Sequence, residues 1–413
     1  MSSSRTASAL LLMPPLPSQR RPDRQPAAAC QNLSNELPEQ DTRGPAGGPA
    51  GARIYLDHAG GWPLLAGAAE ARASAPAANP ASPHTEGRAA RAALDAARDL
   101  AAAALGVVAE SLVFCASGSE AVNLALLGAG RRLPRDRAIV TWAAEHQSVL
   151  AAVRQLGLEG HETAILSVDQ DCLPELNALP ANAGLVSLGL ANNEVGVLQP
   201  VPEAARQAHR IGALFHLDAC QGPQWLRPPL ELADLASFSG HKLGAGGGGL
   251  LYAPLELRLE PLVYGGPQEW GRRAGREDVA AAAGVAAALE VARERRERAA
   301  PTARAQAERL RRALLAAGGR PTGGEPRLPG FATAAFAEER GEDLLLKLDL
   351  AGIAASSGSA CASGSLDPSH VLLAMGLSLE EALGSLRLTT GYDTSDADIE
   401  RAILILGAMR RHA

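Results

Sequence analysis

Short runs of apolar residues alternate with segments of helical spacing between about residues 84 and 255. Most of these runs are apolar throughout, which is typical of strands buried on both faces of a parallel sheet; they cover residues 138–142, 164–168, 185–190, 213–217 and 236–238. Parallel strands need crossover connections, and helical spacing at 120–128, 147–156 and 200–211 supplies them. The pattern therefore predicts an α/β fold in which helices sandwich a mostly parallel sheet, with ligands at the carboxyl ends of its strands.

A different pattern begins near residue 278. Residues 278–318 are rich in Ala, Arg and Glu and predict one or two long helices, with Pro301 as a break or as the first turn of a second helix. Short strand-like runs and an amphipathic helix after Asp396 follow. We therefore expect a large α/β domain over residues 51–293 and a smaller α+β domain over residues 294–413.

The first fifty residues carry no periodic apolar pattern. They are rich in Ser, Pro, Arg, Gln and Ala, which predicts a disordered extension over residues 1–50. The apolar run at 9–13 ends at two prolines and no small-residue cleavage site follows, so we do not expect a secretion signal. The longest apolar stretch elsewhere, at 279–291, is too short to span a membrane, and no membrane association is expected.

Composition narrows the function further. The 413-residue chain has a formal net charge of −6 and no basic stripe, which argues against nucleic acid as a partner. Its five cysteines are scattered, odd in number and lack a CxxC pair, so neither a disulfide framework nor a metal site is expected. These features favour a cytoplasmic protein.

Lysine is almost absent from the chain, because arginine takes nearly every other cationic position. The two lysines are Lys242 and Lys347. An arginine cannot replace the lysine amine in Schiff-base chemistry, so a retained lysine is a candidate nucleophile. Lys242 follows an apolar strand and precedes a glycine run that allows close approach of backbone to a ligand, whereas Lys347 has the setting of a solvated helix residue.

Polar residues directly after predicted strands form the rest of a candidate site. Asp218 ends an apolar strand and would need a cationic partner, such as a protonated pyridine nitrogen, although it could also cap a helix or pair with an arginine. The segment 117–120 precedes a helix and is equally suited to hold a phosphate or to cap that helix. His146 follows another strand; a lone histidine there is more often structural, but its position makes it a candidate acid or base.

Together these motifs resemble the cysteine desulfurases of the NifS and IscS type, a group of class V aminotransferases with the architecture of fold-type I pyridoxal-phosphate-dependent transferases. The likeness runs from about Ile54 to about Leu406. It rests on an ordered set of motifs, which lie at residues 55–57 (Tyr-Leu-Asp), 79–84 (Asn-Pro-Ala-Ser-Pro-His), 117–120 (Ser-Gly-Ser-Glu), 145–146 (Glu-His), 192–196 (Asn-Asn-Glu-Val-Gly), 216–221 (His-Leu-Asp-Ala-Cys-Gln), 239–242 (Ser-Gly-His-Lys), 265–269 (Gly-Gly-Pro-Gln-Glu) and 356–364.

The resemblance implies a role for each matching residue. Lys242 would form the Schiff base with pyridoxal 5'-phosphate and share proton transfers with His146, which stacks on the ring. Asp218 would pair with the pyridine nitrogen. The other implied contacts of the cofactor and of the substrate carboxylate are Gln221 at the phenolic oxygen, Gly118, Ser119, Ser239 and His241 at the phosphate, Asn193 beside both molecules, and Arg387 at the substrate carboxylate.

Cys361 distinguishes desulfuration from related chemistry. It lies in a stretch of serine, glycine and alanine at 356–364, which suits a mobile loop over about 354–367 rather than a rigid core. The resemblance implies that its thiolate takes sulfur from L-cysteine as a persulfide and passes it to a protein acceptor, for iron–sulfur cluster assembly or another pathway. The alternative for this residue is a small cysteine that merely packs, as we expect for Cys115 and Cys220.

Two departures from the family pattern bear on the site. Residues 58–62 read His-Ala-Gly-Gly-Trp where relatives carry asparagine, alanine and two threonines. Arg276 stands where relatives have a threonine that reaches the cofactor phosphate of the partner subunit, and the family implies a homodimer. The alternative functions are a selenocysteine lyase, another class V transaminating or eliminating enzyme, and a non-catalytic relative that binds a partner.

Overall fold

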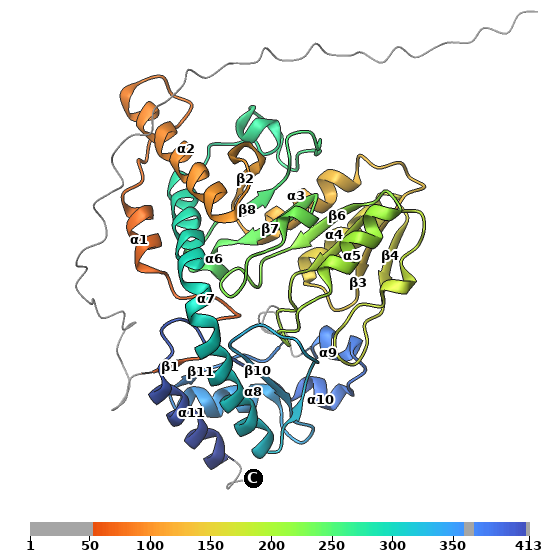
Figure 1. The fold of residues 1–413 in the computed structure, drawn as a ribbon, viewed down its shortest axis with the longest axis vertical. Helices are drawn as coiled ribbons and strands as arrows, with labels where there is room; N and C mark the ends of the chain where they lie inside the picture. The colour runs from red at the N-terminus through yellow and green to blue at the C-terminus, as the bar shows by residue number, and fades with distance from the viewer. Residues whose placement is uncertain (1–52, 359–366, 410–413) are drawn as a thin grey trace, which may run out of the picture. The chain divides into compact units, whose positions relative to one another are not determined.

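A seven-stranded sheet forms the centre of the computed structural model, which describes residues 53–358 and 367–409 (Figure 1). Its strands lie in the order β2-β8-β7-β6-β5-β3-β4. Neighbouring strands are parallel except at β8, which runs antiparallel to both β2 and β7. The strands are β2 (Leu112–Cys115), β3 (Ala138–Trp142), β4 (Thr163–Leu166), β5 (Ala183–Gly189), β6 (Leu214–Asp218), β7 (Leu235–Ser239) and β8 (Gly249–Tyr252). The prediction of a mostly parallel sheet is therefore confirmed.

Helices cover both faces of this sheet because successive side chains along each strand point to opposite sides. Val113 and Ile139 pack with α3 (Gly118–Gly130) and α4 (Gln147–Leu158) on one face. Phe114 and Val140 pack on the other face, which is covered by α2 (Thr85–Leu105), α5 (Val201–Arg210) and the first half of α7 (Val279–Ala316). The sandwich predicted from the apolar pattern is confirmed.

Two small sheets lie beside the large one. Strands β9 (Arg320–Pro321), β10 (Phe331–Ala335) and β12 (Ser385–Thr389) form an antiparallel sheet, while β1 (Ile54–Tyr55) pairs with β11 (Ile353–Ala354). The helices around them are α8 (Gly341–Leu350), α9 (His370–Ala374), α10 (Leu379–Leu383) and α11 (Asp396–Met409). The remaining elements are α1 (Ala66–Ala73), α6 (Gly240–Leu243) and the 3₁₀ turns Ala109–Ser111, Leu176–Ala178, Leu230–Leu232 and Gln268–Gly271.

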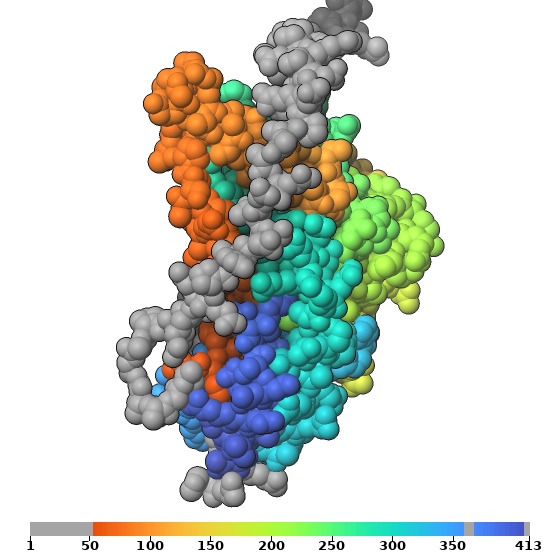
Figure 2. Space-filling model, turned by 60° about the vertical axis from the view of Figure 1, so that its left-hand side comes forward, coloured from red at the N-terminus to blue at the C-terminus, as the bar shows by residue number. Residues whose placement is uncertain are grey.

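Helix α7 connects the large sheet with the small ones. It runs unbroken through Pro301, because packing along its length outweighs the backbone hydrogen bond that a proline removes. Its first half packs on α1 and α2, and its second half packs on α11, as Figure 2 shows for the teal and blue surfaces. The predicted domain boundary after residue 293 falls inside this helix and stays a prediction.

Two further findings concern the described residues. No helix among them is long and apolar enough to cross a membrane. No group of three or more His, Cys, Asp or Glu side chains in these parts of the chain is arranged to hold a metal ion.

His216 gives the sheet a pH-dependent stability. Its ring lies fully buried in β6, between the hydroxyls of Ser187 (2.8 Å) and Ser237 (2.7 Å), and burial lowers its pKa from 6.5 to about 4. Between pH 6.5 and about pH 4, the unfolded chain therefore binds a proton on His216 while the folded chain does not. The free energy of unfolding consequently decreases as pH falls through this range. We expect the free energy of unfolding to fall by roughly 3 kcal/mol from pH 7 to pH 4 through this residue alone, at about 1.4 kcal/mol per pKa unit.

Denaturant unfolding at a series of pH values checks this expectation. A His216→Gln variant has no titrating group at this position, so its unfolding free energy should fall less steeply with decreasing pH than that of the parent protein. Equal slopes for the two proteins would show that His216 does not titrate in this range.

Candidate active site

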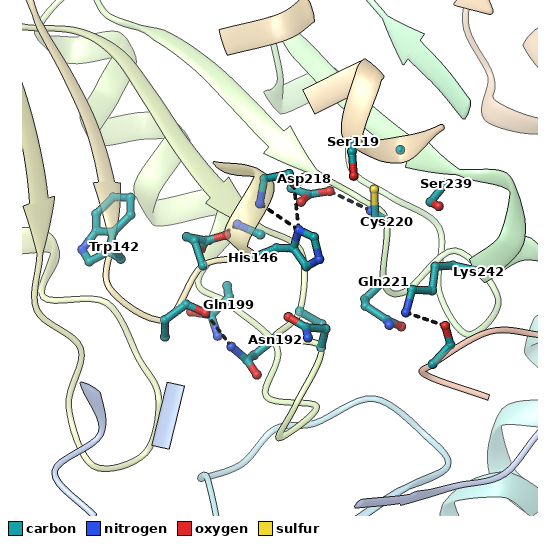
Figure 3. A pocket seen from close by; sticks show the side chains of 18 of the residues that line it. Ser119, Trp142, His146, Asn192, Gln199, Asp218, Cys220, Gln221, Ser239 and Lys242 are labelled. Carbon is teal, nitrogen blue, oxygen red and sulfur yellow. Dashed lines mark hydrogen bonds between the residues drawn. The ribbon is translucent and has the colours of Figure 1, made fainter. Parts of the chain in front are cut away.

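A pocket of about 300 Å³ opens at the carboxyl ends of the parallel strands (Figure 3). This is where ligands bind in sheets of this type. The lining side chains come from segments that directly follow strands β3, β5, β6 and β7 and from the start of α3; they include Ser117, Gly118, Ser119, Glu145, His146, Asn192, Asn193, Asp218, Cys220, Gln221, Ser239, His241 and Lys242. The structure therefore brings nearly every predicted cofactor contact into one cavity.

The start of α3 forms one wall of the pocket. Ser117 is the residue that caps the helix, because its hydroxyl accepts a hydrogen bond from Glu120 N (3.1 Å), and this leaves Ser119 to line the cavity. A Cβ atom at Gly118 would lie 2.6 Å from the Cβ of Ser239, so only glycine fits here. The capping alternative is therefore observed at this helix end, and the anion-binding alternative stays a prediction.

Asp218 lies buried at the end of β6 and lines the pocket. Its Oδ1 accepts a hydrogen bond from Cys220 N (3.0 Å). Among the described residues, no arginine forms an ion pair with Asp218, so the alternative that it pairs with an arginine is not observed in that part of the chain. The carboxylate is thus placed to hold a cationic group of a ligand.

Lys242 is the lysine that lines the pocket. Its Nζ donates to the backbone oxygens of Ala59 and Gly60, the latter at 2.9 Å, and Gln221 Nε2 donates to the same oxygen of Ala59 (2.8 Å). Lys347 lies on α8 and forms an exposed ion pair with Glu339 (2.9 Å). Lys242 therefore lies in the pocket and Lys347 lies on an exposed helix face, in the two settings that the sequence predicts.

Residues 58–62, whose sequence differs from the family pattern, form the turn whose backbone oxygens bind Lys242 and Gln221. His58 is buried and hydrogen-bonds Thr389 O through Nδ1 (3.0 Å). Its ring also packs edge-on against Trp62 (4.9 Å between centroids), which contacts Tyr392 (4.6 Å). These aromatic contacts stabilise the turn, and none of the three rings is among those that line the pocket.

His146 caps α4 and faces the pocket. Its Nδ1 accepts a hydrogen bond from Ser148 N (3.1 Å) and lies 2.7 Å from Ser148 Oγ. A ring nitrogen that accepts from an N–H carries no proton, so in the neutral ring the proton is on Nε2. Ser148 therefore fixes the Nδ1 side of the His146 ring.

Two neighbours of these residues are held neutral by their surroundings. Burial raises the pKa of Glu145 to about 8, although Gly189 N donates to its carboxylate (3.0 Å). Burial and the nearby Lys242 and His146 lower the pKa of His241 to about 4, and its Nδ1 lies 2.9 Å from Ser239 Oγ. A neutral His241 can bind an anion by a hydrogen bond but not by an ion pair.

Arg387 lies on β12 and is not among the residues that line the pocket. Its guanidinium donates to Asn193 O (2.7 Å) and to Asp57 Oδ1 (2.9 Å), while its buried Nε has no hydrogen-bond partner in the described parts of the chain. Asn193 itself lines the pocket. The two predicted substrate ligands are therefore neighbours, and an acidic side chain already contacts the arginine.

The remaining predicted residues differ in where they lie. Arg276 is exposed, and its guanidinium donates to Ala77 O (3.3 Å), outside the pocket. Cys361 lies outside the described residues. Cys115 is buried and Cys220 is partly buried, and burial raises the pKa of both thiols.

Sequence reasoning missed several parts of the site. The oxygens of Ala59 and Gly60 are backbone atoms, which leave no signal in the sequence. Cys220 lines the pocket, although we expected only a packing residue. Its neighbour Asp218, at the end of a strand, was the signal that could have placed it there.

Comparison with known proteins agrees with this geometry. The family model for class V aminotransferases matches residues 54–402. The chain therefore belongs to the class V aminotransferases.

Curated relatives show the family within this class. A cysteine desulfurase from Trichormus azollae is 39% identical over 341 residues, which cover 79% of this chain and 84% of that protein. The cysteine desulfurase NifS of Azotobacter vinelandii is 37% identical over 338 residues, with the same two shares. A solved NifS-like protein superposes with a TM-score of 0.81 at 28% identity, covering 87% of this chain and all of the other. The chain therefore belongs to the cysteine desulfurase family of class V aminotransferases.

Proposed function

We propose that the protein converts L-cysteine to L-alanine and transfers the sulfur to Cys361 as a persulfide. The observation that carries this proposal is the pocket, in which Lys242, His146 and Asp218 converge in a chain that belongs to the cysteine desulfurase family. The reaction balances without another reactant. The C–S bond of cysteine breaks and an S–S bond forms at Cys361, while the Cys361 thiol loses one proton and the methyl carbon of alanine gains one.

The residues of the pocket fit pyridoxal 5'-phosphate. The glycine-only contact at Gly118 and the start of α3 form an anion cradle, and the buried Asp218 suits a protonated ring nitrogen. When bound, this cofactor supplies an electron sink that stabilises negative charge on the substrate Cα. The residues proposed to hold it are Gly118, Ser119, Ser239 and His241 at the phosphate, Asp218 and Gln221 at the ring, His146 on its face, Asn193 beside it, and Lys242 at the aldehyde carbon.

The side chains of the pocket divide the proton transfers between them. Lys242 Nζ is proposed to remove the proton from the substrate Cα, because an amine in a partly buried site can act as a base. His146 Nε2, whose partner nitrogen is fixed by Ser148, is proposed to exchange a second proton. Asn193 and Arg387 are proposed to hold the substrate carboxylate together, since the Arg387 guanidinium donates to Asn193 O (2.7 Å) and Asn193 lines the pocket.

The test of this function measures the products directly. Purified protein given L-cysteine should release L-alanine in an amount equal to the sulfur bound to protein or freed as sulfide by a reducing thiol. Conversion of L-selenocysteine without any reaction of L-cysteine would favour the lyase alternative, and pyruvate in place of alanine would favour an eliminating enzyme.

Assembly and downstream partners are part of the proposal. We propose a cytoplasmic homodimer, in which the exposed Arg276 reaches the cofactor phosphate of the partner subunit by a charge-assisted hydrogen bond. A protein acceptor is proposed to take the persulfide sulfur, for iron–sulfur cluster assembly or another sulfur-transfer pathway. A protein that is fully active as a monomer by light scattering would contradict the dimer.

A further inference from the structure

Glu120 lies in the first turn of α3, next in sequence to Gly118 and Ser119, which are proposed to hold the cofactor phosphate. Its Oε2 accepts a hydrogen bond from Ala116 N (2.7 Å), so the side chain also holds the backbone that leads into the helix. A helix start attracts negative charge, whether the charge belongs to a side chain or to a bound anion. The Glu120 carboxylate and a phosphate would therefore compete for the same end of α3.

An ion pair neutralises the charge of Glu120. Its Oε1 accepts from Arg273 Nε (3.0 Å), and 24% of the arginine and 19% of the glutamate side chain are exposed. Arg273 belongs to the segment between β8 and α7, and the two residues lie 153 positions apart in the sequence. The fold therefore supplies the cation that removes this competition.

A second carboxylate beside the same helix start is paired in the same way. Glu269 is 5% exposed, and its Oε2 accepts from Phe114 N (3.0 Å) in β2, the strand that leads to α3. Both of its oxygens accept from Arg98, at 2.5 and 3.0 Å. Breaking a buried pair of this kind would destabilise the fold by leaving a charge without its partner, whereas the Arg273 pair is partly exposed. Arg273 is therefore the arginine whose charge can be removed to test its effect on the helix start.

We propose that Arg273 is a positioning residue for the cofactor, which acts through Glu120 to keep the start of α3 attractive to the phosphate group. This inference rests on the proposed function, since that function places the phosphate at Gly118 and Ser119. A charge at a helix end acts mainly within the first turn and is weakened by salt, so the effect is expected on the phosphate and at low ionic strength. The ring of the cofactor is proposed to bind other residues and should not sense it.

Equilibrium dialysis of the full-length protein measures this effect with two probes, pyridoxal 5'-phosphate and pyridoxal, which lacks the phosphate. Arg273→Ala should raise the dissociation constant for pyridoxal 5'-phosphate about fivefold at low ionic strength, with a smaller change at high salt. The dissociation constant for pyridoxal should not change. Arg131→Ala is the matched control, because Arg131 ends α3 and pairs with Glu159 at similar exposure (24% and 26%), and it should match the parent with both probes.

Removing the carboxylate as well distinguishes an effect of charge from simple bracing of the fold. Glu120→Gln keeps an acceptor oxygen for Ala116 N but carries no charge, so Arg273→Ala combined with Glu120→Gln should recover the affinity of the parent. Glu120→Gln alone should bind pyridoxal 5'-phosphate more tightly than the parent, since the charge of Arg273 is then free to attract the phosphate.

An unchanged affinity of Arg273→Ala for pyridoxal 5'-phosphate, an equal loss with pyridoxal, or no recovery in the double variant would overturn the positioning role. Should Arg273→Ala not fold, Glu120→Gln decides, and an affinity equal to or below that of the parent would overturn it. A parent protein that binds no pyridoxal 5'-phosphate would refute the proposed function instead.

Discussion

A Lys242→Ala variant should lose alanine production by at least about a thousandfold, because both the covalent link to the cofactor and the proposed base at the substrate Cα are removed. Nothing else described in the pocket supplies a primary amine, since Lys347 lies on the surface in an ion pair with Glu339. Borohydride reduction of the parent protein followed by peptide mapping should find a pyridoxyl group on the peptide that contains Lys242.

Lys347→Ala is the matched control for this variant. It removes the other lysine of the chain at an exposed position and should leave turnover and the pyridoxyl adduct unchanged. A pyridoxyl group on Lys347, or a protein with no such adduct after incubation with the cofactor, would show that the assignment of Lys242 is wrong.

Cys361→Ser should reduce alanine release from L-cysteine to below about 1% of the parent rate, because a hydroxyl cannot form a persulfide. Cofactor binding should be unaffected, since the residues proposed to hold the cofactor are unchanged. The change in the visible spectrum on adding L-cysteine should also remain. This combination separates loss of the sulfur acceptor from loss of the site.

Cys30→Ser is the control for the cysteine variant. Cys30 precedes the described residues and belongs to the predicted N-terminal extension, so its replacement should leave the rate unchanged. Full cysteine turnover by Cys361→Ser would favour a selenocysteine lyase or transaminase, in which this thiol is dispensable.

The sheet could be predicted well where strands are buried on both faces. Residues 138–142 are predicted with the bounds of β3, and β5, β6 and β7 differ from prediction by one or two residues at their ends. The strands β2 and β8 were missed. Strand β8 begins in a run of glycines, which do not carry an apolar pattern, and its pairing with β2 joins residues more than 130 positions apart.

The site could be predicted where chemistry requires a particular side chain. Lys242 and Asp218 could be identified because an amine and a carboxylate that directly follow buried strands need a partner of opposite charge or a chemical role. Two other features could not be found, because they depend on how the folded chain brings distant residues together. Arg387 contacts Asp57 across 330 positions, and Arg273 contacts Glu120 across 153 positions.

The most direct test of the account follows the sulfur atom itself. Parent protein is treated with L-cysteine, its thiols are trapped with an alkylating reagent, and the peptides are weighed by mass spectrometry. The account predicts one added sulfur on the peptide that contains Cys361 and none on those that contain Cys115 or Cys220, whose thiols both have raised pKa values. An added sulfur found only on another cysteine, or on none, would contradict it.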